Sequence, residues 1–278
     1  MSLNEFIDNE REYFLPMLSR AERSSPEQRK QWRLETVNQR QERISFEVYN
    51  LLGGRVRYGP FKGLKLNRDT WWGRLDLGSM CLGLYEKELL NFIDRISPNQ
   101  FSCFIDIGAA DGYYACGLLS SGKVQKAICF EQNLEGREVI QSNWEKNNSI
   151  GELLVFGEAN AHSISSLPSA DLQNALVLVD IEGAEFDALT EDVLETLKFC
   201  TVIVEIHNWV DDFLTKYEQL LSDMHRYFDV EIIQRVERPT SEFEELRDFT
   251  DDNRLLLTSE RRPCLMRFLM LIPKVKGS

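Results

Sequence analysis

The sequence contains few of the residues that build metal sites and disulfide frameworks. Its 278 residues include three histidines and six cysteines, and no two cysteines form a C-x-x-C pair. This spacing argues against a structural zinc site, which needs clustered Cys or His ligands. Several cysteines lie within apolar runs, so we expect buried free thiols of the kind found in a reducing compartment.

Long apolar runs and an excess of basic residues are also missing. No stretch approaches the ~18 consecutive apolar residues that a membrane span needs. The opening residues, Met1 to Asp8, lack the basic and apolar segments of a signal peptide. We therefore expect a cytoplasmic protein with no membrane span. Acids outnumber Lys plus Arg by 45 to 32, for a net charge of −13, and so few basic residues predict no nucleic-acid partner.

Residues 1–55 differ in texture from the rest of the chain. They are rich in Glu, Arg and Gln, and their apolar residues lie three and four positions apart, which predicts amphipathic helices. One helix is expected to begin at Pro26 and to end at Gly53-Gly54. Its apolar stripe is expected to comprise Trp32, Val37, Ile44, Val48 and Leu51. We expect a helical arm that packs on the main domain. A substrate lid or a homo-oligomer contact is the alternative.

Residues 56–278 alternate between apolar strand-like runs and helical segments. This alternation predicts a doubly wound α/β fold around a seven-stranded, mostly parallel sheet. The runs are continuously apolar, as strands covered on both faces require. The expected strands are Cys103–Ile107, Ala127–Phe130, Leu153–Phe156, Ala175–Val179, Thr201–Ile206, Val230–Ile233 and Leu265–Ile272. The expected helices include Glu86–Ile96, Gly136–Asn147, Ala184–Leu197 and Asp211–Tyr227.

Such sheets bind ligands just beyond the carboxyl ends of their strands, where this chain places many acids. Asp106 and Gly108 stand at the end of the first run, and Glu131 follows the second run, 25 positions after Asp106. An acid in that place can accept both hydroxyls of a ribose. The turn lacks the middle glycine of G-x-G-x-x-G, and acids there repel a pyrophosphate. S-adenosylmethionine, which has two cationic groups and no phosphate, is therefore preferred over a dinucleotide.

Several motifs resemble one known family. Residues 104–114 look like the first motif of class I methyltransferases in the form found in the FkbM family. Residues 178–185 resemble that family's Asp-x-Glu-Gly-x-Glu signature, 204–207 its fifth-strand ending, and 84–86 a short upstream element. The similarity spans roughly residues 59–206 and implies the Rossmann-like methyltransferase fold. The family usually has Asn where Ala110 stands and an aliphatic residue where Asp111 stands.

The combined reading predicts three groups of site residues. The cofactor is expected to contact Glu86, Asp106, Gly108, Ala109, Asp111, Gly112, Tyr113, Glu131, Asn160 and Asp180. The acceptor is expected to contact Trp72, Glu182 and Glu205. Catalysis is assigned to His207 and Asp180, with His207 as the proton acceptor because its ordinary pKa of ~6.5 suits a general base. Glu185 is expected to open the next helix, where a carboxylate favours the helix dipole.

The predicted function is S-adenosylmethionine-dependent O-methylation, with S-adenosylhomocysteine as the second product. The resemblance implies a hydroxyl on a sugar, glycan or polyketide-like intermediate. Methylation of a nitrogen or a carboxylate, or a cofactor-binding scaffold without catalysis, are the alternatives. Asp180, Glu182, Glu205 and His207 share one edge of the sheet and also offer ligands for a divalent metal, which is the less favoured use of this group.

Overall fold

The computed structural model describes residues 1–274, except for the side chains of residues 16–23. Seven strands form one sheet in the order β3-β2-β1-β4-β5-β7-β6. All pairings are parallel except those of β7, which runs antiparallel to β5 and β6. The predicted fold class, a doubly wound α/β fold around a seven-stranded, mostly parallel sheet, is confirmed. The strands are β1 Phe104–Ile107, β2 Lys126–Phe130, β3 Glu152–Phe156, β4 Leu176–Val179, β5 Thr201–Ile206, β6 Phe228–Ile233 and β7 Arg267–Pro273.

The strand register brings the ends of the central strands level. Ile107 of β1 lies opposite Phe130 of β2 and Val179 of β4, and Val179 lies opposite Val204 of β5. The residues that follow therefore emerge along one edge of the sheet. Because side chains alternate between faces, Asp106, Glu131, Asp180, Glu205 and His207 all fall on the same face. Register and alternation together assemble the predicted acids.

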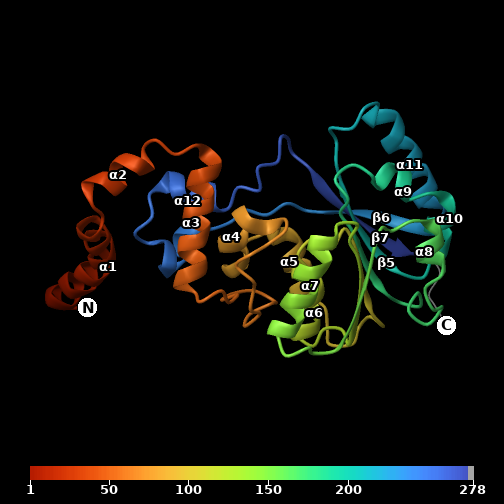
Figure 1. Ribbon diagram of the computed structural model, residues 1–278, viewed down its shortest axis with the longest axis horizontal. Helices are drawn as coiled ribbons and strands as arrows, with labels where there is room; N and C mark the ends of the chain where they lie inside the picture. The colour runs from red at the N-terminus through yellow and green to blue at the C-terminus, as the bar shows by residue number, and fades with distance from the viewer. Residues whose placement is uncertain (275–278) are drawn as a thin grey trace.

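Helices cover both faces of the sheet, as Figure 1 shows. One apolar cluster joins Phe104, Cys129 and Leu178 to the helices of one layer, and a second joins Ile105, Phe130 and Val179 to those of the other. The first layer contains α4 Leu77–Cys81, α5 Lys87–Asp94, α6 Tyr113–Ser120 and α7 Leu134–Lys146. The second contains α8 Ala161–Ser165, α9 Glu185–Ala188, α10 Glu191–Thr196 and α11 Phe213–Tyr227. None of the described helices is long and apolar enough to cross a membrane.

The N-terminal arm contains two helices where one was predicted after Pro26. Its helices are α1 Leu3–Arg23, α2 Pro26–Trp32 and α3 Val37–Leu51. The single helix expected after Pro26 is wrong, because Thr36 caps a new helix by accepting a hydrogen bond from the Gln39 N–H. The expected apolar stripe is only partly buried. Ile44 and Val48 are buried, whereas Val37 and Leu51 are exposed.

The last helix of the arm shares a core with the C-terminal part of the chain. Ile44 and Val48 of α3 belong to an apolar cluster with Leu246 and Leu257, which lie in the segment that joins β6 to β7. This segment contains two short 3-10 turns and α12 Asp251–Leu257. Figure 1 shows α12 beside α3. The boundary at residue 55 and a homo-oligomer contact through the arm stay predictions.

Two further expectations can be compared with the structure. The helix expected over residues 184–197 is divided into α9 and α10, because Leu189 leaves the helical conformation and Thr190 caps the second segment. All six cysteines are free thiols, as expected, and five of them are buried. Cys264 is exposed.

The two faces of α3 lead to a stability prediction. Ile44→Ala removes a fully buried side chain and is expected to lower the free energy of unfolding by ~2–5 kcal/mol. Leu51→Ala alters an exposed leucine on the same helix and is expected to change the free energy of unfolding by less than ~0.5 kcal/mol. Urea unfolding of both variants measures the difference. Equal effects would contradict the packing of α3 against the C-terminal segment.

Candidate functional site

A cavity of about 920 Å³ opens at the carboxyl edge of the sheet, where β1 meets β4. This is the point where strand order reverses, and sheets of this type bind ligands there. The predicted site residues that line it are Trp72, Asp106, Gly108, Ala109, Asp111, Tyr113, Glu131, Asn160, Asp180 and Glu182. Four other predicted residues, Gly112, Glu86, Glu205 and His207, are not among the lining residues. Seven carboxylates line the cavity, and its described lining contains no Lys, Arg or His.

The turn after β1 brings backbone rather than side chain to the cavity. Gly108 has a φ of +93°, and a Cβ at this position would lie 1.8 Å from the Asp180 carbonyl oxygen. Gly112 caps α6 with a φ of +73° and so supports the turn, although it does not line the cavity. Ala110 also adopts a left-handed φ of 47°. Asn tolerates this conformation better than Ala, which accounts for the Asn that the resemblance leads one to expect there.

Two hydrogen bonds fix the Glu131 carboxylate and leave some of its acceptor positions free. One carboxylate oxygen accepts the Ala110 N–H at 2.9 Å, and the other accepts the Asn133 N–H at 2.8 Å. A carboxylate offers about four acceptor positions, so two remain for a ligand. The side chain is buried and lines the cavity. Glu131 is therefore fixed in orientation and still able to accept two hydroxyl groups.

Asp106 is a buried acid in the floor of the cavity. Burial raises its pKa to about 8, and the nearby Asp180 and Glu131 carboxylates add to the effect. Within residues 1–274, no hydrogen bond to its carboxylate is found that would offset this cost. A cationic ligand group would stabilise the ionised form.

Asp111 lines the cavity and also binds the backbone of a neighbouring loop. Its two carboxylate oxygens accept the backbone N–H groups of Trp71, Trp72 and Gly73, the shortest at 2.7 Å. The Asn143 amide in turn donates to the Asp111 carbonyl at 2.8 Å. Asp111 thus fixes the Trp71–Gly73 loop as one wall of the cavity. Trp72 is half-exposed on that wall.

His207 lies behind Asp180 rather than in the cavity. Its side chain is only 1% exposed, and Nδ1 lies 3.2 Å from both Glu185 carboxylate oxygens. Nε2 lies 3.5 Å from Asp180 Oδ1 and 3.7 Å from Glu182 Oε2. Glu185 also accepts the His207 backbone N–H at 2.8 Å. Glu185 does begin α9, as predicted, but its carboxylate holds the histidine.

Glu86 and Glu205 belong to a buried ion-pair network beside the cavity. Arg262 binds both carboxylates and also Glu260, which pairs with Arg238. Burial, together with the Asp180 carboxylate, raises the pKa of Glu86 to about 8 and that of Glu205 well above its ordinary value. Arg262 was not predicted. It comes from the segment between β6 and β7, where no sequence periodicity indicates a site residue.

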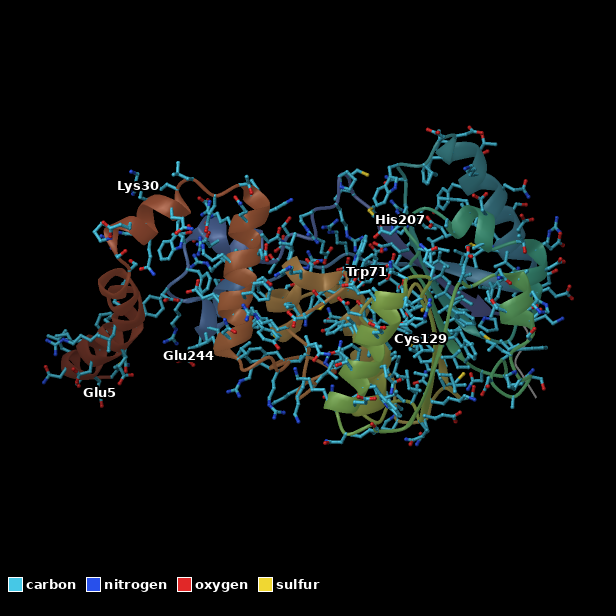
Figure 2. The ribbon with its side chains drawn as sticks, viewed as in Figure 1. Glu5, Lys30, Trp71, Cys129, His207 and Glu244 are labelled. Carbon is cyan, nitrogen blue, oxygen red and sulfur yellow. The ribbon has the colours of Figure 1, made fainter. Side chains whose placement is uncertain are left out.

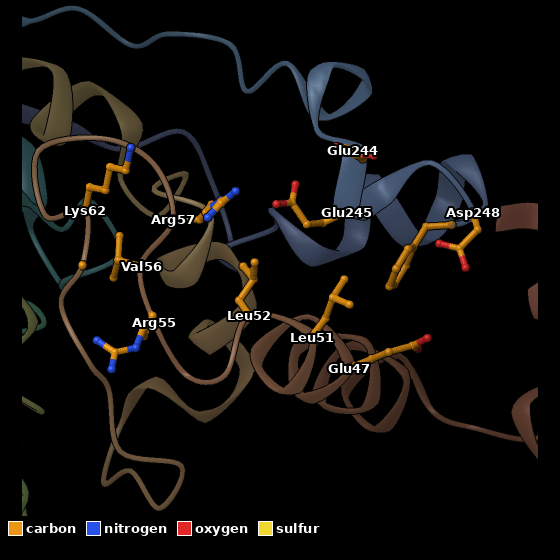
Figure 3. Close-up of a pocket in the computed structure, with 12 residues that line it drawn as sticks. Glu47, Leu51, Leu52, Arg55, Val56, Arg57, Lys62, Glu244, Glu245 and Asp248 are labelled. Atoms are coloured by element: carbon orange, nitrogen blue, oxygen red, sulfur yellow. The ribbon is translucent and has the colours of Figure 1, made fainter. Parts of the chain in front are cut away.

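A second cavity, of about 870 Å³, lies away from the strand ends (Figure 3). Arg55, Arg57 and Lys62 line one side, opposite Glu244 and Glu245 of the C-terminal segment. Tyr58 donates a hydrogen bond to Glu245. Figure 2 shows Glu244 on the side of the molecule nearer the arm, away from His207 and Trp71 at the centre. This cavity contains none of the predicted site residues.

No model of a known protein family matches the chain, and no curated protein matches it. Among solved structures, a putative methyltransferase from Streptococcus mutans in complex with SAH has a TM-score of 0.44 at 13% identity, covering 67% of this chain and 96% of its own. An rRNA methylase from Streptococcus thermophilus has 0.42 at 12%, covering 66% and 92%. A precorrin 8w decarboxylase from Methanobacterium thermoautotrophicum has 0.42 at 16%, covering 68% and 90%. Likenesses this distant add nothing to the fold that the strand order already defines.

The close approach at Gly108 predicts a large effect of a single methyl group. Gly108→Ala and Gly122→Ala both place a side chain at positive φ, which costs ~1–2 kcal/mol. Only the first also forces backbone atoms apart, which adds ~1–3 kcal/mol, because Gly122 has open space around it. Denaturant unfolding compares the two variants. Equal losses would show that the turn after β1 can move away from β4.

Proposed function

We propose that the chain is an S-adenosylmethionine-dependent methyltransferase. The observation that carries this proposal is the pairing of Glu131, held with two free acceptor positions, and Asp106, a buried acid without a cation, in one cavity at the β1/β4 edge. Glu131 suits the two ribose hydroxyls, and Asp106 suits an ammonium group. The Trp71–Gly73 loop forms a wall that excludes water from one side.

The charge of the cavity supports this cofactor over a phosphorylated one. Seven carboxylates and no basic side chain form its described lining, so a pyrophosphate would meet repulsion and no counter-charge. S-adenosylmethionine carries a sulfonium and an ammonium group against one carboxylate, and that carboxylate can be bound by backbone N–H groups of the turn. The residues present therefore fit S-adenosylmethionine.

S-adenosylmethionine supplies a methyl group on a sulfonium, which is a good leaving group. The protein then has to align the acceptor, exclude water and take a proton from a hydroxyl. Asp180 is the strand-end acid nearest this task, because it lines the cavity and burial raises its pKa toward that of a useful base. His207 does not reach the cavity lining, so we revise its proposed role from direct proton acceptor to support of Asp180.

The acceptor class rests on the motif resemblance. We propose membership of the FkbM family and O-methylation of a sugar, glycan or polyketide-like hydroxyl, with Glu182 and Trp72 beside the acceptor. Glu182 lines the cavity and is half-exposed, so it can hydrogen bond to several hydroxyl groups. Glu205 is bound by Arg262 and is better placed to hold the edge of the site than to contact an acceptor. Methylation of a carboxylate needs no base and would tolerate Asp180→Asn. Methylation of a nitrogen stays a further alternative.

Calorimetric titration of the purified protein with S-adenosylmethionine tests the cofactor. Glu131→Ala is expected to weaken binding by ~1–3 kcal/mol, because a buried pair of hydrogen bonds to the ribose is lost. Glu135→Ala, an exposed acid at the start of α7, is the matched control and should bind like the parent. Binding of NADH without binding of S-adenosylmethionine would overturn the proposal.

The raised pKa of Asp106 predicts proton release. With a pKa of about 8, Asp106 is mostly protonated in the free protein at pH 7, facing Asp180 and Glu131. An ammonium group favours the ionised form, so binding should expel up to one proton, and affinity should rise as the pH approaches 8. Titrations in two buffers of different ionisation enthalpy measure this release. Asp106→Asn should abolish this proton release. Equal proton release from the parent and from Asp106→Asn would refute the pairing of Asp106 with the ammonium group.

A further inference from the structure

We propose that Asp180, Glu182 and His207 form a binding site for one divalent cation of the magnesium and manganese class. One ligand atom from each lies within 4.8 Å of the other two. Binding of the ion does not depend on the proposed cofactor. Its use, to hold an acceptor through hydroxyl oxygens beside the transferred methyl group, rests on the proposed function.

His207 is oriented as a metal ligand. Both Glu185 oxygens lie 3.2 Å from Nδ1, so that nitrogen carries the proton and Nε2 points toward the acids. A carboxylate that binds the far nitrogen in this way fixes the ring and strengthens its basicity in known metal sites. The side chain is 1% exposed, and Nε2 faces carboxylate oxygens of Asp180 at 3.5 Å and of Glu182 at 3.7 Å. A buried nitrogen that faces two carboxylates can share a cation or a proton with them.

The distances leave room for an ion between these atoms. Nε2 lies 3.5 and 3.7 Å from oxygens of Asp180 and Glu182, longer than the ~2.7–2.9 Å of a charge-assisted hydrogen bond. Neighbouring ligands of an octahedral ion with bonds of ~2.1 Å lie ~3.0 Å apart. An ion would therefore draw these ligand atoms slightly closer together.

Asp180 supplies an independent sign of a missing partner. Its Oδ1 is buried and accepts no hydrogen bond, although an uncompensated carboxylate oxygen is costly to bury. The same atom is the one that faces His207 Nε2. This buried oxygen and the buried His207 nitrogen come from two neighbouring strand ends and face each other.

A neighbouring cluster of acids is paired with an arginine, whereas, within the described residues, Asp180 and Glu182 are not. Glu86, Asp180 and Glu205 also gather their oxygens within 4.8 Å. There, Arg262 binds Glu86 and Glu205 and supplies the positive charge. No Lys or Arg in the described part of the chain forms an ion pair with Asp180 or Glu182. Two carboxylates and one imidazole are mostly oxygen donors, a set that suits magnesium or manganese.

The site opens toward the acceptor. Asp180 and Glu182 line the cavity, whereas His207 lies beneath them. An ion with only three protein ligands keeps other coordination positions for water or substrate oxygens. This arrangement favours an acceptor that presents hydroxyl groups. It gives His207 the role of a metal ligand beneath Asp180 instead of that of a direct proton acceptor.

Manganese binding to the full-length protein, stripped with EDTA and free of S-adenosylmethionine, tests the site. Loss of the free Mn²⁺ electron paramagnetic resonance signal should report one ion per chain, and millimolar Mg²⁺ should displace it. His207→Gln and the half-exposed Glu182→Gln should each weaken Mn²⁺ binding at least tenfold. Glu185→Gln should weaken it ~10–100-fold through the ring orientation alone. His162→Gln, at an exposed histidine on α8, should bind Mn²⁺ like the parent.

Thermal unfolding with and without Mn²⁺ provides a second measurement. The ion should raise the midpoint of the parent and of His162→Gln, but not that of Glu182→Gln. Absence of Mn²⁺ binding by the parent, or equal binding by Glu182→Gln, would overturn the proposal. S-adenosylmethionine binding without Mn²⁺ binding would remove the metal site and leave the proposed function standing. Mn²⁺ binding without S-adenosylmethionine binding would leave the metal site standing and refute the proposed function.

Discussion

Mutual repulsion among carboxylates at one edge of the sheet is the constraint to which the rest of the site is fitted. Parallel strands with level ends place Asp106, Asp180 and Glu205 on the same face, and burial makes their ionisation costly. On one side of the site, Arg262 compensates this negative charge by binding Glu205 and Glu86. On the other flank, Glu185 turns His207 toward Asp180 and Glu182. No Lys or Arg in the described part of the chain forms an ion pair with Asp180 or Glu182, so these central acids remain available to a cation.

The sequence could predict those features of the fold and the site that depend on local sequence pattern. Apolar runs of four to six residues, each followed by a helical segment, suffice to identify a parallel sheet and hence to place acids such as Asp106, Glu131 and Asp180 at its edge. The single helix expected from Pro26 to Gly53-Gly54 was wrong, because the first helix ends at Trp32 and Thr36 caps the start of another. Apolar spacing alone carries no information about such a break.

The contacts that define the roles of the site residues were beyond local pattern. Arg262 meets Glu205 across 57 positions of sequence, and Glu185 meets His207 across 22. Position at a strand end correctly placed His207 at the edge of the sheet, yet it could not reveal that Glu185 holds the ring beneath Asp180. Asp111 likewise stands in the cofactor turn by sequence, while its carboxylate binds the backbone of a loop almost forty residues earlier.

One electrostatic property connects the proposed cofactor with the proposed ion. A cavity lined by seven carboxylates and by no basic side chain in the described chain favours cations of any kind. Asp106 and Glu131 lie at its β1/β2 end, where an organic cation with a ribose fits. Asp180 and Glu182 lie at the β4 end, where Nε2 of His207 adds a nitrogen ligand. Separate placement of the two cations along one edge would leave the space between them for the acceptor. The repulsion among the carboxylates therefore also determines where each component of the reaction is held.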